Sequence, residues 1–186
     1  MHGTAQIAQP TTEARTTRYA SAYISPCGQY RYRLTRIWNE GDPADYPRPF
    51  MLPIVMLNPS TADERLDDPT IRRCIGFAKR EGYLGLMVAN LFALRATNPG
   101  ELQRAANPFG PDNEHALDYV LDYAQCRRIP VLCAWGANSM AIGQAERFKR
   151  IARMTETKLA CLGTTNSGAP RHPLYVNGAQ PLEDFA

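Results

Sequence analysis

The chain has 186 residues, of which 44% are hydrophobic and 21% charged, which is the length and composition of a single globular domain with a sizeable core. No apolar run approaches the roughly 20 residues that span a bilayer, which excludes a membrane-spanning helix. The net charge of +3 excludes a strongly basic chain. Basic residues nevertheless outnumber acidic ones between 127 and 171, where the chain could contact phosphates.

The N-terminal residues 1–17 are polar, without periodicity and without the apolar core of a signal peptide. We expect a flexible segment over residues 1–20 and a single domain over 21–186. The five cysteines are scattered and form no CxxC pair, which disfavours both a zinc site and a disulfide framework. We therefore expect a protein of the reducing cytoplasm with no metal and no cofactor, and nothing in the sequence indicates its oligomeric state.

The first predicted elements are two strands and a helix. Residues 30–38 (YRYRLTRIW) alternate Tyr and Leu with Arg and Thr, which predicts a half-exposed strand. Residues 51–57 (MLPIVML) form a continuous apolar run, as in a strand buried on both faces. The segment that follows predicts a helix, because Asp68 can cap its N-terminus, Pro69 suits its first turn and a glycine suits its end.

The second half of the chain repeats this alternation. Apolar runs predict strands at 84–94, 129–136 and 157–163, and amphipathic segments predict helices at 110–128 and 137–154. Strands that alternate with helices predict an α/β protein whose short, mainly parallel sheet is covered by helices on both faces. In such sheets, ligands bind at the carboxyl ends of the strands.

Polar side chains follow each of the apolar runs, so we expect them to meet at one edge of the sheet. They are Asn58, Ser60, Thr61 and Asp63 after the first run, Asn90 and Arg95 in and after the second, Trp135, Asn138 and Ser139 after the third, and His172 after the fourth. An amide buried within an apolar strand costs about 1–3 kcal/mol unless it is hydrogen-bonded, so Asn90 has either a ligand or a structural partner.

Each of these residues also has a structural interpretation. Asn58 precedes a proline and is a good turn former, the Ser60–Asp63 segment can cap the next element, and Trp135 can belong to the core. His172 lies in a stiff loop, APRHPLY at 169–175, where it can be an ordinary hydrogen-bonded histidine. The turn WGANS could present N–H groups to an anion, but the chain has no GxGxxG, GxxxxGK[ST] or GxSxG motif.

Several motifs resemble one family in order and content. The segments VMLNPSTAD, DDPTIRRC, NLFALRAT, AWG and RHPLY together are similar to DUF1643, a bacterial family named only as a domain of unknown function. The resemblance extends from about Tyr30 to the C-terminus and implies no activity.

The same motifs bear a more distant resemblance to the uracil-DNA glycosylase superfamily. In that superfamily a water-positioning motif ends the first strand, a base-reading Asn lies in the next, and a Trp-Gly strand end and a His-Pro loop follow. The corresponding segments here are LNPS, LMVANLFALRA, VLCAWGANS and RHPLY. This resemblance implies a three-layer α/β/α sandwich and a DNA partner.

The resemblance also implies residue roles. Asn58 would orient the attacking water, Asn90 would read the edge of an extruded base, and His172 would stabilise the departing base, with Asp63 as a further catalytic candidate. The remaining candidates are Ser60, Thr61 and Arg95 for the ligand, Phe92 or Trp135 for stacking on the base, Leu174 and Tyr175 as a DNA wedge, and Ser139 and Arg171 for phosphate.

The chain also departs from the superfamily pattern. Efficient uracil enzymes have Asp where this chain has Asn58, although some mismatch-directed relatives have Asn, and the Ser-Pro pair that usually follows the His-Pro is missing. Asp67 or Asp68 could supply a carboxylate. The prediction is a base-excising enzyme that hydrolyses an N-glycosidic bond of a damaged or modified base in DNA. The alternatives are a hydrolase of free nucleosides or nucleotides, and a non-catalytic binder of an unusual base or nucleotide.

Overall fold

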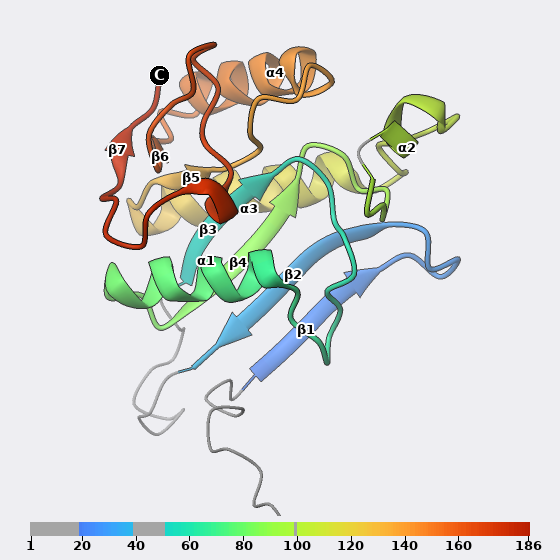
Figure 1. Cartoon of the computed structure of the whole chain (residues 1–186), viewed down its shortest axis with the longest axis horizontal. Helices are drawn as coiled ribbons and strands as arrows, with labels where there is room; N and C mark the ends of the chain where they lie inside the picture. The colour runs from blue at the N-terminus through green and yellow to red at the C-terminus, as the bar shows by residue number, and fades with distance from the viewer. Residues whose placement is uncertain (1–18, 39–50, 99) are drawn as a thin grey trace, which may run out of the picture.

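The structure is a computed structural model that describes residues 19–38, 51–98 and 100–186 (Figure 1). These residues contain one seven-stranded sheet with the strand order β1-β2-β4-β3-β5-β6-β7. The strands are β1 (Tyr19–Ile24), β2 (Arg31–Ile37), β3 (Met51–Met56), β4 (Gly85–Asn90), β5 (Val131–Cys133), β6 (Leu159–Cys161) and β7 (Glu183–Asp184). The predicted flexible segment 1–20 lies outside the described residues except for its last two, which begin β1.

The sheet is mixed, so the prediction of a mainly parallel sheet is wrong. The pairs β3–β4, β3–β5 and β5–β6 are parallel, whereas β1–β2, β2–β4 and β6–β7 are antiparallel. Parallel neighbours need a crossover connection, which α1 provides between β3 and β4 and α4 provides between β5 and β6. The parallel strands form the centre of the sheet, and their shared direction brings the ends of β3, β4 and β5 to one edge.

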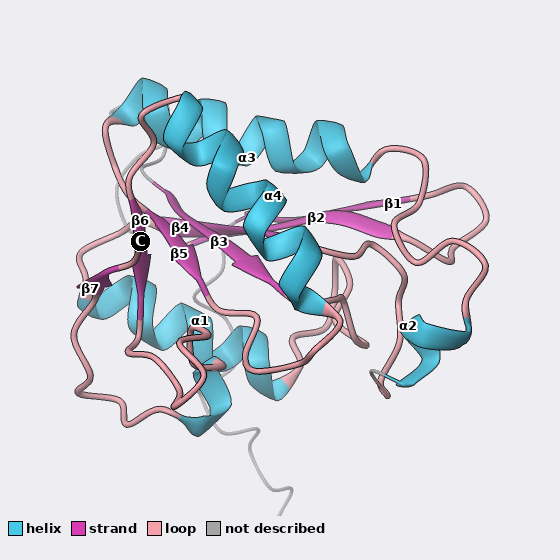
Figure 2. Ribbon diagram, turned by 90° about the horizontal axis from the view of Figure 1, so that it is seen from above, coloured by secondary structure: helices cyan, strands magenta, loops and turns pink. Residues whose placement is uncertain are grey.

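Helices lie on both faces of the sheet. They are α1 (Pro69–Arg80), α2 (Gly100–Arg104), α3 (Asn113–Arg127) and α4 (Ala141–Met154), with a short 3₁₀ turn, η2 (Pro173–Tyr175). Figure 2 shows α3 and α4 on one face and α1 on the other. The predicted start of α1 is confirmed, because Asp68 Oδ1 accepts a hydrogen bond from the Ile71 N–H at 2.8 Å and Pro69 is the first helical residue.

The four predicted apolar runs contain β3, β4, β5 and β6, and the predicted helices contain α3 and α4. The strands β1 and β7 and the short α2 were not predicted. The half-exposure predicted for 30–38 is also wrong, since Arg31 and Arg36 are each 2% exposed. The loop after β3 covers both: Arg31 donates to the carbonyl of Ala62, and Arg36 forms an ion pair with Asp67.

The core lies between the sheet and the helices on its two faces. Every residue of β4 is buried, and the apolar side chains of α1, α3 and α4 pack on the same central strands. No helix within the described ranges has the length and apolar character that crossing a membrane requires. The packed centre therefore fixes where the three central strands end and the loops after them begin.

Candidate functional site

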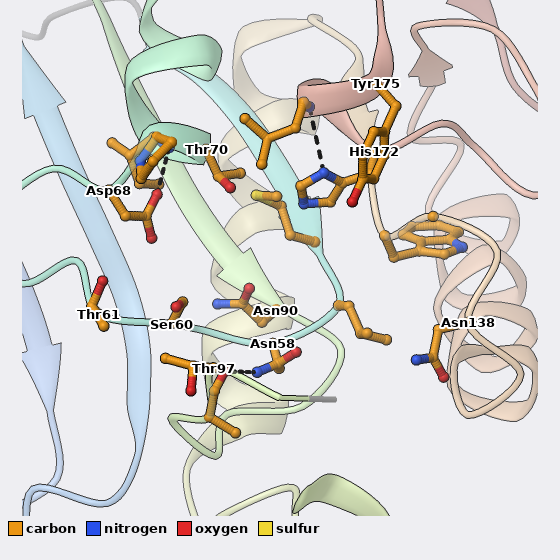
Figure 3. Close-up of a pocket in the computed structure, with 18 of the residues that line it drawn as sticks. Asn58, Ser60, Thr61, Asp68, Thr70, Asn90, Thr97, Asn138, His172 and Tyr175 are labelled. Carbon is orange, nitrogen blue, oxygen red and sulfur yellow. Dashed lines mark hydrogen bonds between the residues drawn. The ribbon is translucent and has the colours of Figure 1, made fainter. Parts of the chain in front are cut away.

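A cavity of about 570 Å³ lies at the carboxyl ends of β3, β4 and β5 (Figure 3). The loop after β3, the start of α1 and the loop that contains η2 form the rest of its wall. The sequence predictions are confirmed in one respect: the separate strand ends converge. The predicted residues that line the cavity are Asn58, Ser60, Thr61, Asn90, Trp135, Asn138, His172, Leu174 and Tyr175.

The side chain of Asn90 is a buried polar group in the wall of this cavity. It ends β4 and is 1% exposed, and neither Nδ2 nor Oδ1 has a hydrogen-bond partner. The backbone around it is well held, because Asn113 donates through Nδ2 to the carbonyls of Asn90 and Leu91 at 3.0 and 3.1 Å. The strand end is thus fixed while the Asn90 amide has an unused donor and an unused acceptor, which is costly without a ligand.

Asn58 has a defined orientation in the loop after β3. Its Nδ2 donates to the carbonyl oxygens of Pro59 at 3.0 Å and Ala96 at 2.8 Å. Both partners are acceptors, so the NH₂ group must face them and the Oδ1 atom is on the other side of the amide. Figure 3 shows Asn58 and Asn90 facing the same space. Asn58 therefore offers the cavity a hydrogen-bond acceptor that does not take up a proton.

The loop 169–175 is held from two sides. The Gly136 N–H, after β5, donates to the carbonyl of Pro170 at 3.0 Å. Gly136 has φ +75°, which favours glycine. From the other side, Arg73 of α1 donates to the carbonyls of Pro173, at 3.4 Å, and Val176. These bonds place His172 over the cavity without help from a ligand.

The imidazole of His172 is half-buried. Its Nδ1 faces the Leu174 N–H at 3.4 Å as an acceptor, so the proton of the neutral ring is on Nε2. Burial lowers the pKa of His172, and the negative charge of Asp68 only partly opposes this. At neutral pH the ring is neutral and has one N–H donor, at Nε2.

Two apolar side chains stand at the rim beside the histidine. Leu174 is 44% exposed and Tyr175 is 82% exposed, although both line the cavity. The Tyr175 ring lies 5.7 Å from the His172 ring, centroid to centroid. The mouth of the cavity is therefore flanked by apolar groups that are available to a partner.

The cavity also contains two charged residues: Asp68, which was named as a possible source of a carboxylate, and Arg31, which was not predicted as a site residue. Asp68, expected as a helix cap, does cap α1 and also lines the cavity. Arg31, expected on a solvent face, is buried in the wall. Burial lowers the pKa of Arg31 to about 10, so it is still protonated at neutral pH. No local pattern reveals this placement, since it depends on the loop that covers β2.

Both stacking candidates belong largely to the core. Phe92 is buried, stacks on Phe109 at 5.2 Å and lies outside the cavity lining. Trp135 does line the cavity, but it is buried and packs edge-on against Phe148 and Phe185. A base in the cavity could therefore stack on only a part of the Trp135 ring.

Four other predicted residues lie outside the cavity lining. The Asp63 carboxylate accepts hydrogen bonds from the N–H groups of Arg65 and Leu66, and these bonds lower its pKa. Asp63 therefore stabilises a turn. Arg95 lines an adjoining cavity of about 400 Å³. Ser139 lines a neighbouring hollow beside α4, and the exposed Arg171 donates to the Thr164 carbonyl. In the described ranges, no group of three or more His, Cys, Asp or Glu is placed to hold a metal ion.

One comparison with known proteins gave a match. The family model described as "Protein of unknown function (DUF1643)" matches residues 31–174, which include every residue of the cavity lining except Tyr175. No curated protein and no solved structure matches the chain.

Proposed function

Because the chain belongs to the DUF1643 family, whose description assigns no activity, we propose its function from the cavity: it removes a damaged or modified base from DNA by hydrolysing the N-glycosidic bond. The observation that carries the proposal is the buried, unpartnered amide of Asn90. An amide presents one donor and one acceptor side by side, which matches the paired groups on the edge of a nucleobase.

The base would enter the cavity with its edge toward Asn90. Neither polar atom of Asn90 is used within the described protein, so a bound base would supply both missing hydrogen bonds. A base with the complementary pair would be favoured over one without it, because an unmatched edge leaves these buried groups unpaired. Asn90 would thus be the main residue that selects the base.

The chemistry would begin with departure of the base. The bond between the sugar C1′ and the base nitrogen breaks, and its electron pair goes to the base. The Nε2–H of His172 would donate to the base where this negative charge collects, and a neutral imidazole held in place does so without reorganisation. The Asp68 carboxylate, which lines the same cavity, would favour the positive charge that develops on the sugar.

A water molecule would complete the reaction. Asn58 Oδ1, turned away from the two carbonyls that its NH₂ group binds, can accept a hydrogen bond from a water and orient it toward C1′. The water oxygen bonds to C1′ and its proton passes to solvent, since an amide oxygen is not a base. Without a general base, the reaction is slow unless the bond to the base breaks before the water attacks. We therefore expect substrates whose damaged or modified base is a good leaving group.

The exposed apolar side chains at the rim of the cavity favour DNA over a free nucleoside as the substrate. A duplex enzyme needs an apolar group to occupy the gap left by an extruded base, and Leu174 and Tyr175 are exposed beside the cavity mouth. An enzyme for free nucleosides would have no use for such exposed groups. The helices on both faces of the sheet agree with the α/β/α layering of the uracil-DNA glycosylase superfamily, and that distant resemblance remains part of the proposal.

The test is an excision assay. Single-stranded and duplex oligonucleotides that contain uracil, mismatches or modified bases are incubated with the protein, and alkali then cuts any abasic site. Strand cleavage that is lost in His172→Ala and in Asn90→Ala, but kept in His115→Ala on the exposed side of α3, would support the proposal. The absence of cleavage on every substrate, with folded wild-type protein, would rule it out.

One observation favours a second function, binding of an unusual base without hydrolysis. The group that faces the cavity from the first strand end is the amide of Asn58, which cannot accept a proton from water. A folded protein that retains a modified oligonucleotide and releases it unchanged would have this second function.

A further inference from the structure

Two arginines lie on one face of a short antiparallel pairing beside the cavity. Tyr30 and Leu94 form an isolated antiparallel bridge, in which Arg31 donates its N–H to Ala93 and Arg95 donates its N–H to Gln29. Each arginine is one residue from the bridged pair, on opposite strands. Their side chains therefore leave the same face as diagonal neighbours, close enough for both to reach one small ligand.

Both guanidinium groups have an unused donor. The Nε atoms of Arg31 and Arg95 are buried and have no hydrogen-bond partner. Arg31 uses Nη1 for the Ala62 carbonyl at 2.6 Å, and Arg95 uses Nη1 for the Gly28 carbonyl at 3.2 Å. A buried guanidinium with a free Nε–H is costly and is typical of a site that receives an anion.

Neither arginine forms an ion pair with a carboxylate of the described residues. The ion pairs among residues 19–38, 51–98 and 100–186 include neither Arg31 nor Arg95. The negative charges of Asp68 and Asp63 act on Arg31 and raise its pKa. Asp68 accepts from the Ile71 N–H, and Asp63 accepts from two N–H groups of its own turn. The positive charge of two arginines is therefore only partly balanced, and burial adds to its cost.

Residues with hydroxyl groups line both of the cavities that the two arginines line. Arg31 lines the main cavity and Arg95 lines the adjoining one, and Ser60, Thr61 and Thr97 line both. The two cavities thus meet at a place with two fixed cations and several hydroxyl donors. A tetrahedral oxyanion, with acceptors in several directions, suits this set better than a planar carboxylate.

We infer that Arg31 and Arg95, with the hydroxyls of Ser60 and Thr61, form a phosphate-binding subsite next to the base site. In the proposed function, this subsite would hold a phosphate adjacent to the extruded nucleotide, and that role rests on the proposed function. The affinity of the subsite for phosphate does not depend on the proposed function. The location differs from the phosphate contacts expected from the sequence, Ser139 and Arg171, which lie outside the lining of both cavities.

The first test is titration of the wild-type protein with inorganic phosphate at constant ionic strength, followed by thermal unfolding and isothermal calorimetry. The inference requires saturable binding that chloride does not reproduce. Arg95→Gln and Arg31→Gln should each weaken it by about tenfold or more, as loss of a charge-assisted hydrogen bond predicts. Arg65→Gln is the control, because it makes the same charge change on a highly exposed side chain and should leave the affinity within about twofold.

Arg31→Gln removes a buried group and can unfold the protein, so Arg95→Gln and the wild-type titration keep the test decisive. Absence of saturable phosphate binding to the folded wild-type protein would overturn the inference. Equal weakening by Arg65→Gln and Arg95→Gln would overturn it as well, because the effect would then be one of net charge.

A second experiment separates the two sources of phosphate. The probes are 2-deoxyribose 5-phosphate and a single-stranded oligonucleotide with one abasic site, neither of which presents a base to Asn90. A subsite for the DNA backbone predicts a loss of oligonucleotide affinity in Arg95→Gln, whereas a subsite for free nucleotides predicts that only the monoester binds. Both results support the subsite. Phosphate binding without base excision would leave the subsite intact and remove only the proposed function.

Discussion

The side-chain Nδ2 of Asn58 lies 2.8 Å from the carbonyl oxygen of Ala96 and ties the end of β3 to the segment that follows β4. The same nitrogen also donates to the carbonyl of Pro59. An amide is required at this position, because a carboxylate of the same shape has no hydrogen to donate. Asn58 thus has a structural task at the end of β3, and its Oδ1 atom lies on the other side of the amide.

Replacement of Asn58 by Asp should therefore destabilise the protein. Asn58→Asp loses both donated bonds and sets a negative charge against two carbonyl oxygens, so we expect a loss of about 1–3 kcal/mol of unfolding free energy in urea. The control is Asn138→Asp in the same cavity wall, where Oδ1 accepts from the Met140 N–H and an Asp keeps that bond. It should change stability by less than about 0.5 kcal/mol. Equal stability of the two variants would mean that the Asn58 amide is turned the other way.

The stability of the protein should fall in mildly acidic solution because of His172. Burial lowers the folded-state pKa of this ring below 6.5, so the unfolded chain binds its proton more readily. The contribution of His172 is fully present above pH 6.5 and is lost as the pH falls from there toward the folded pKa. His172→Gln should show a smaller loss of melting temperature between pH 7.5 and pH 5 than the wild type. The exposed His115→Gln should follow the wild-type curve, and an unchanged pH dependence in His172→Gln would contradict the burial argument.

The exposed rim should matter for duplex DNA and not for folding. Tyr175→Ala removes a side chain that is 82% exposed, so the melting temperature should stay close to that of the wild type. Under the proposed function, excision from duplex DNA should fall about tenfold or more, while excision from single strands, which need no wedge, should be nearly unchanged. Met154→Ala, an equally exposed apolar residue at the end of α4, serves as the control. Equal losses on both substrates would assign Tyr175 to the base pocket instead.

The sequence predicts the centre of this fold well because local patterns determine it. Continuous apolar runs identify β3, β4, β5 and β6, and the Asp68–Pro69 pair identifies the start of α1. The chain gives no such signal for β7, which has only two residues and whose pairing with β6 depends on the folded sheet. The antiparallel strands at the two edges are the reason that the sheet is mixed.

The site is predicted in outline by the same reasoning, since parallel strands must end at one edge. That rule brings Asn58, Asn90 and His172 together. It does not tell where each following loop turns, so Asp63 is in a turn and Arg95 faces the adjoining cavity. The sequence does not predict that Arg31 lines the cavity. The burial of Arg31 requires contact with Ala62, 31 residues further along the chain, and an alternating strand pattern indicates only that an arginine faces solvent.

Asn90 offers the clearest separation of stability from function. Its two polar atoms are buried and unpartnered, so Asn90→Leu, which replaces them with apolar groups of similar shape, should leave stability unchanged or raise it by up to about 2 kcal/mol. Binding or excision of the base should be lost in the same variant. A residue that costs stability and is needed only when a ligand is present is what a preformed binding site requires.

Asn113→Leu is the matched control for this prediction. Asn113 is also buried and its Oδ1 likewise has no hydrogen-bond partner, but its Nδ2 donates to the carbonyls of Asn90 and Leu91 at the end of β4, so its loss should destabilise the protein by about 1–3 kcal/mol. Opposite signs for the two variants in the same urea experiment would assign Asn113 to the structure and Asn90 to the ligand. A destabilisation of similar size in both would mean that Asn90 is part of a buried structural network, and the case for a base-reading amide in this cavity would be lost.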